Sequence, residues 1–270
     1  MTRVTPVIVE EHPVADSAAG PYALTTGPDG ALWFTLVHGG RIGRLVPGQE
    51  PTSHRLAPDS GPTVITPGPD GALWFTEYKA DRIGRITTDG VIDEFDLPTP
   101  GCGPFGIAAG PDGALWFTEA GADRVGRITV DGRITEFPLP ITGAFPSAIT
   151  AGGDGGMWFT LNQAGAIGRI GMDGAVALHP LPTEAAAPAG IAAGRGGGAR
   201  EGRIEGVEEH DSYDLDRSRP PPGRLRTVLR RGSRAVGSPA AVGAPRCLGL
   251  GGHAAPGPSP VSGPLGPGAG

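Results

Sequence analysis

Four tryptophans recur at a nearly constant spacing, and this spacing constrains the fold more than any other feature of the sequence. They lie at Trp33, Trp74, Trp116 and Trp158, so the intervals are 41, 42 and 42 residues. The first three sit in the identical phrase GPDGALWFT, and the fourth sits in the related phrase GGDGGMWFT. A fixed period of this length is typical of repeat architectures.

Each repeat contains further phrases on the same period. RIGRL, RIGRIT, RVGRIT and AIGRI follow the four tryptophans, and stretches such as RITEFPLP follow an Asp-Gly pair. Asp-Gly favours tight hairpin turns, and no segment of the repeat has ten residues of helical periodicity. Four short antiparallel strands in about 42 residues predict one blade of an all-β β-propeller. A β-solenoid is the alternative, but its coils are usually shorter and lack three hairpin turns in each unit.

The N-terminal segment resembles the outermost strand of a repeat. VEEHPV at Val9–Val14 aligns with ITEFPL at Ile134–Leu139, yet no inner strand precedes it. We expect such an early outer strand to complete the last blade and close the ring. A closed ring of four blades is disfavoured, because the fourth repeat already has its own outer strand in VALHPLPT.

The repeat stops abruptly. GIAAG at Gly190–Gly194 copies GIAAG at Gly106–Gly110, but RGGGAREGR follows it where PDGALWFTE is expected. The sequence therefore predicts an incomplete propeller in residues 1–194, with four blades and one strand of a fifth, and a tail in residues 195–270.

The tail differs from the repeats in composition. All eight phenylalanines and all four tryptophans precede residue 161, whereas eleven arginines lie in residues 195–270. A Gly-, Pro- and Arg-rich segment of this kind buries too little apolar surface to offset its chain entropy, so we expect disorder. The tail is either a genuine extension or the product of out-of-frame translation, and the abrupt break inside a repeat favours the frameshift.

Two clusters in the tail do not predict a site. VEEHDSYD around His210 gathers carboxylates without a strand or helix to position them, and metal sites need positioned ligands. The basic run Arg224–Arg234 has no aromatic residue to stack on bases, so we interpret it as a nonspecific tail.

Charge and cysteine content exclude several classes of protein. The formal net charge is −6, which favours neither a nucleic-acid nor an anionic-membrane partner. Cys102 and Cys247 are too few for a disulfide framework or a zinc site. Because the sequence has no signal-peptide pattern and no apolar run of transmembrane length, a cytoplasmic location is expected.

The combination of GPDGALWFTE, DRIGRITTDG and ITEFPLPT resembles the virginiamycin B lyase (streptogramin B lyase) family over about residues 9–194. The resemblance implies a propeller of seven blades that is monomeric when intact. It also implies opening of a cyclic depsipeptide antibiotic by elimination at its threonine ester, with Mg²⁺ as the cofactor, and hence antibiotic resistance.

The family's catalytic groups are a His in a Pro-His pair of the sixth blade, and a His and two Glu residues of the seventh. Those blades have no counterpart in this repeat, so no catalytic residue or metal ligand is assigned to the chain. We therefore expect a chain truncated before the catalytic blades and inactive alone. The alternative is a non-catalytic propeller that binds a partner at its channel mouth.

Two sets of repeat positions are candidates for ligand binding by a complete propeller. The residue after the proline that opens each inner strand includes Tyr22 and Phe105, and the residue after WFT includes Glu77 and Glu119. We expect these positions near the channel mouth, with aromatic rings that meet a cyclic peptide and carboxylates that hold its polar groups. The alternative interpretation is that they only pack or hydrogen-bond between neighbouring blades.

Overall fold

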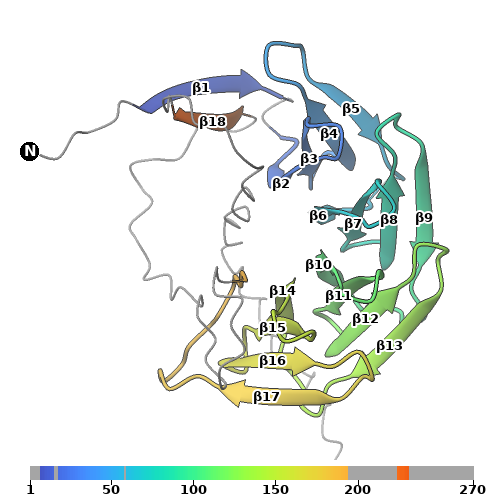
Figure 1. Cartoon of the computed structure of the whole chain (residues 1–270), viewed down its shortest axis with the longest axis vertical. Coiled ribbons are helices and arrows are strands. Elements are labelled where there is room, and N and C mark those ends of the chain that lie inside the picture. Colours follow the sequence, from blue (N-terminus) through green and yellow to red (C-terminus); the bar gives the residue numbers. More distant parts are fainter. Residues whose placement is uncertain (1–6, 15–17, 58, 194–223, 231–270) are drawn as a thin grey trace, which may run out of the picture.

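The computed structural model describes residues 7–14, 18–57, 59–193 and 224–230. Four antiparallel sheets of four strands follow one another along the chain and form an arc around a common centre (Figure 1). The predicted all-β propeller blades are thereby confirmed. Within the described residues, no helix is long and apolar enough to cross a membrane.

The strands of each blade pair in sequence order, from an inner to an outer strand. Blade 1 contains β2 (Pro21–Thr26), β3 (Leu32–Leu36), β4 (Arg41–Leu45) and β5 (Thr52–Arg55). Blade 2 contains β6 (Pro62–Pro67), β7 (Leu73–Glu77), β8 (Arg82–Ile86) and β9 (Ile92–Asp96). Blade 3 contains β10 (Pro104–Ala109), β11 (Leu115–Glu119), β12 (Arg124–Ile128) and β13 (Ile134–Pro138). Blade 4 contains β14 (Pro146–Ala151), β15 (Met157–Leu161), β16 (Ala166–Ile170) and β17 (Val176–Pro180).

The N-terminal strand pairs differently from the prediction. β1 (Val7–Pro13) lies antiparallel to β18 (Arg224–Arg230), with Val7 opposite Arg230. The expected pairing with a last blade of the ring is therefore not what the structure shows. The strand predicted for a fifth blade is GIAAG at Gly190–Gly194; the structure describes residues 190–193 of it, and these form no strand. The residues of the predicted tail, 195–270, lie outside the described ranges, with the exception of β18 (Arg224–Arg230).

Apolar side chains of successive blades fill the space between the sheets. Trp74 and Ile83 of blade 2 pack in one buried cluster with Ile107, Leu115 and Phe117 of blade 3. A blade thus buries one face against the next blade, and the tryptophans of the first three repeats, Trp33, Trp74 and Trp116, belong to this inter-blade core, whereas Trp158 is half-buried. The period of the sequence is the period of these contacts.

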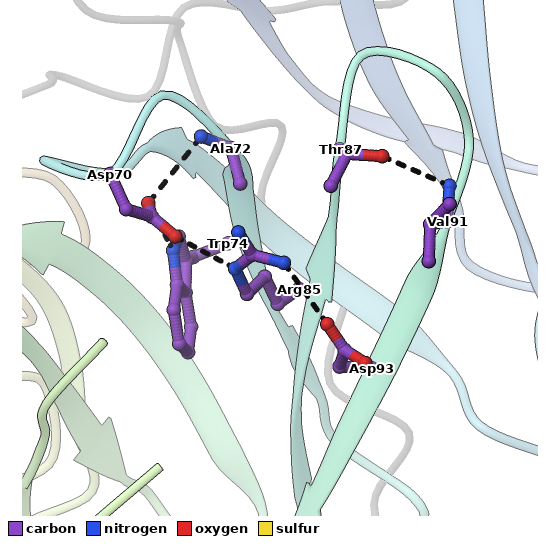
Figure 2. A network of polar contacts seen from close by, with 7 residues as sticks. All are labelled: Asp70, Ala72, Trp74, Arg85, Thr87, Val91 and Asp93. Atoms are coloured by element: carbon purple, nitrogen blue, oxygen red, sulfur yellow. Dashed lines mark hydrogen bonds and ion pairs between the residues drawn. The ribbon is translucent and has the colours of Figure 1, made fainter. Parts of the chain in front are cut away.

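A hydrogen-bonded network explains why the letters Asp, Trp and Arg recur together. Asp70 accepts bonds from Trp74 Nε1 at 3.0 Å and from Arg85 Nε at 2.7 Å (Figure 2). The Arg85 guanidinium lies 6.0 Å from the centre of the Trp74 ring, which also stacks on Phe95. The network recurs in every blade, with the carboxylates of Asp29, Asp112 and Asp154.

The glycine of each Ile-Gly-Arg or Val-Gly-Arg phrase is required by close packing. A Cβ atom added to Gly84 would lie 2.1 Å from the Phe75 ring, which crosses the neighbouring strand at that point. Gly126 has the same relation to Phe117. Any side chain here would displace a fully buried aromatic ring, so the repeat keeps glycine.

Candidate functional site

The candidate ligand positions gather at the end of the propeller where the inner strands begin and the second strands end. Pro104, which opens β10, pairs with Glu119, the last residue of β11. Pro62 and Glu77 pair in the same way in blade 2. Strand register therefore places the opening proline opposite the residue after WFT, and the post-proline residue is the next one along the inner strand.

Aromatic rings from all four blades meet at this end, around Phe105. The centre of the Phe105 ring lies 6.1 Å from that of Tyr22 and 6.1 Å from that of Tyr78, both edge to face. The Phe145 ring lies 6.3 Å away in a tilted arrangement. All four side chains are half-buried. We call these four residues the aromatic cluster.

Sequence reasoning identified Tyr22 and Phe105 but missed the other two members of the aromatic cluster. Tyr78 follows Glu77 directly, and Phe145 directly precedes Pro146. Tyr78 is therefore one residue away from a position that the repeat alignment had selected, and Phe145 is two residues away from the post-proline position of blade 4, Ser147. An aromatic residue within two positions of a selected one was the signal that could have found them.

The two candidate carboxylates are enclosed by protein. Glu77 and Glu119 have an exposed fraction of 0%, because their side chains share the buried strand face with Phe75 and Phe117. Glu77 Oε2 accepts a bond from Arg82 Nη2 at 2.8 Å, whereas Glu77 Oε1 has no partner among the described residues. Neither carboxylate oxygen of Glu119 has a hydrogen-bond partner among those residues.

Burial shifts both carboxyl groups toward the neutral form. Desolvation raises the pKa of Glu77 to about 7, opposed by the bond from Arg82. Desolvation raises the pKa of Glu119 to about 8, and the nearby Glu136 carboxylate adds to the shift. At neutral pH, Glu119 is therefore mainly a neutral carboxylic acid inside the propeller.

Threonine hydroxyls fix the backbone on which the aromatic cluster stands. The hydroxyls of Thr63 and Thr76 are 2.7 Å apart, and Thr76 Oγ1 donates to the carbonyl oxygen of Phe105 at 2.7 Å. Thr118 Oγ1 donates across the next boundary to the carbonyl oxygen of Ser147 at 2.6 Å. Thr63 is the post-proline residue of blade 2, and its hydrogen bonds join neighbouring blades, as the alternative interpretation of these repeat positions expects. The same bonds hold the backbone of Phe105 in place.

The described residues do not fit a magnesium site. Across the part of the chain that the structure describes, no three His, Cys, Asp or Glu side chains gather in a way that could hold a metal ion. The Glu119 carboxyl group is enclosed, whereas Mg²⁺ in proteins usually keeps several water ligands. Among the described residues, the candidate site therefore offers a rigid aromatic surface.

Comparisons of the sequence with known proteins all identify virginiamycin B lyases as similar to this chain. The model of the virginiamycin B lyase family matches residues 7–208. A virginiamycin B lyase of Saccharopolyspora erythraea is 63% identical over 100 residues, which are 37% of this chain and 33% of that protein. One of Streptomyces coelicolor is 64% identical over 39 residues, 14% of this chain and 13% of that protein.

Solved structures extend the comparison to the fold. A streptogramin B lyase structure superposes with a TM-score of 0.68 at 39% identity, covering 70% of this chain and 64% of the other. A catalytically inactive histidine-to-alanine variant of the Staphylococcus aureus virginiamycin B lyase, solved with quinupristin, gives 0.63 at 45% identity, covering 65% and 60%. The matched part of this chain thus spans less than two thirds of these solved lyases and about a third of the Saccharopolyspora protein.

Proposed function

Because this chain belongs to the virginiamycin B lyase family, we propose that it binds type B streptogramins, the cyclic depsipeptide antibiotics that the family opens. The observation that carries the proposal is the aromatic cluster around Phe105, to which all four blades contribute. Rigid aromatic faces suit a large cyclic peptide because they bury apolar area at little cost in side-chain entropy.

The reaction that follows binding in this family is an elimination. A base removes the α proton of the threonine residue, the bond between its Cβ and the ester oxygen breaks, and the carboxylate leaves. A carbon–carbon double bond remains, no water is consumed, and the linear product has the same mass as the ring. Loss of the ring inactivates the antibiotic, so resistance is part of the proposal.

We place the catalytic base outside the described blades. A general base must come within hydrogen-bond reach of the proton that it removes. Glu119 is completely enclosed and its pKa of about 8 keeps it protonated at neutral pH, and Glu77 is enclosed and bonded to Arg82. The aromatic cluster holds the substrate in this proposal, and the chain alone does not open it.

Quinupristin binding to the full chain tests the proposal. Phe105→Leu removes the central ring of the aromatic cluster, and Phe95→Leu is the matched control, because Phe95 stacks on Trp74 of its own blade. We expect Phe105→Leu to raise the Kd about tenfold, which corresponds to ~1.4 kcal/mol, and Phe95→Leu to leave it unchanged. Absence of binding by the unmodified chain, or an equal effect of both variants, would overturn the proposal.

A non-catalytic binding module is the second candidate. The described blades supply an aromatic surface, and the two candidate carboxylates at that end, Glu77 and Glu119, are enclosed, which suits a binding module. A Pro-His pair and a partner Glu encoded in further repeats would favour the enzyme, and repeats without them would favour the binding module.

A further inference from the structure

An aspartate caps the loop between blades 2 and 3. Asp81 lies in the turn after β7, and its carboxylate accepts bonds from the backbone N–H groups of Gly101 at 2.6 Å and of Gly103 at 2.9 Å. Cys102 Sγ lies 3.5 Å from the same carboxylate. Asp123 repeats the arrangement between blades 3 and 4. Each loop thus presents backbone N–H groups to one carboxylate.

Blade 1 has the same loop without the carboxylate. The repeat places Gly40 where blade 2 has Asp81, and the two backbones share a positive φ, of 57° and 52°. The loop Asp59–Gly61 corresponds to Gly101–Gly103. Among the described residues, the backbone N–H groups of Asp59 and Gly61 have no acceptor. Ser60 Oγ is completely buried and likewise has no partner there.

The space that a carboxylate would fill is open in blade 1. A Cβ atom added to Gly40 would have Ser60 Oγ as its nearest neighbour, at 3.5 Å. A cavity of about 210 Å³ adjoins this point, and Gly40, Asp59 and Gly61 help to line it. Blade 4 differs, because the carbonyl oxygen of Ala186 lies 3.0 Å from the corresponding position on Gly165.

Basic side chains surround the cavity in blade 1. His38, Arg55 and Lys79 line it, against the one carboxylate of Asp59. Arg55 also pairs across the strands with Arg41, and within the described residues neither arginine has an ion pair. The local charge is therefore positive.

Blade 2 neutralises the same positions with acidic residues. Its Arg82 pairs across the strands with Asp96 and forms ion pairs with Glu77 and Glu94. In blade 1, Leu36 stands where blade 2 has Glu77, and Ser53 stands where it has Glu94. The excess of positive charge is thus a property of blade 1 and not of the repeat.

We propose that the cavity between blades 1 and 2 binds a small carboxylate, which takes the place of the missing aspartate side chain. The N–H groups of Asp59 and Gly61 and the Ser60 hydroxyl donate to the bound carboxylate, and Arg55 and Lys79 balance its charge. This site is separate from the aromatic cluster and does not depend on the proposed function.

Acetate is the probe, and the backbone amide resonances of Asp59 and Gly61 are the readout in the full chain. We expect both to shift with saturable dependence on sodium acetate, and not with sodium chloride at equal ionic strength. Gly40→Asp supplies the carboxylate covalently and should abolish the acetate response. Gly40→Ala is the matched control, since it adds the Cβ without a carboxylate and should retain the response.

A second variant keeps the test independent of position 40. Lys79→Gln should weaken acetate binding at least threefold, whereas Arg133→Gln, a highly exposed change on blade 3, should leave it unchanged. The proposal is overturned if neither amide responds to acetate, if chloride produces the same shifts, or if Gly40→Asp responds like the unmodified chain.

Discussion

Replacement of Glu119 by glutamine should stabilise the protein, and the gain should grow with pH. The Glu119 side chain is completely buried, without a hydrogen-bond partner for either oxygen among the described residues. Its pKa is raised from 4.5 to about 8, chiefly by desolvation. Glutamine is neutral at every pH, so the variant removes the ionisation of this position and keeps its shape.

Proton linkage determines the direction in which the free energy of unfolding changes with pH. A raised pKa means that the folded state binds the proton more tightly than the unfolded state, so the free energy of unfolding decreases as pH rises from about 4.5 to about 8. One pKa unit corresponds to ~1.4 kcal/mol, so this residue costs up to about 3 kcal/mol at pH ~7 and almost nothing at pH ~4.5. Water penetration and local relaxation make this an upper bound.

Urea denaturation at about pH 4.5 and about pH 7 measures the effect. The difference between Glu119→Gln and the unmodified chain should widen by up to ~3 kcal/mol over this interval. Asp131→Asn is the control, because Asp131 is exposed and its pKa is lowered by bonds from Thr129 and Arg133. A difference for Glu119→Gln that does not change with pH would refute the reasoning.

Two further predictions concern the repeat. Asp70→Ala should lower the free energy of unfolding by about 3 kcal/mol, since it leaves Trp74 Nε1 and the Arg85 guanidinium without their acceptor. Asp93→Ala, which removes a more exposed partner of Arg85, should cost at most about 1 kcal/mol, and equal costs in urea denaturation would contradict the role of the network. Sequencing of the coding DNA after the Gly194 codon should reveal a shifted reading frame that encodes PDGALWFTE and further blades. Absence of repeats in every frame would refute the frameshift hypothesis.

The sequence predicts the blades well because their determinants are local. Asp-Gly turns and short apolar stretches define hairpins, and the spacing of Trp74 from Trp116 counts the residues of one blade. The network around Asp70 could not be read from the letters alone. Asp70 and Arg85 are fifteen residues apart, and only the pairing of β7 with β8 brings them together.

The environment of the candidate site was harder to predict. Thr76 and Glu77 are neighbours in the sequence, but alternate strand residues point to opposite faces. Thr76 bonds to blade 3, whereas Glu77 shares the other face with Phe75. Which of these faces is buried against a neighbouring blade depends on the packing of the sheets, and the repeat period carries no information about it.

Turnover of quinupristin by the purified full chain tests the central claim most directly, because chromatography with mass spectrometry separates its outcomes. We expect the antibiotic to bind and to be recovered as the intact ring, with or without added Mg²⁺. A linear product of unchanged mass would show elimination, and would contradict the claim that this chain alone binds the ring without opening it.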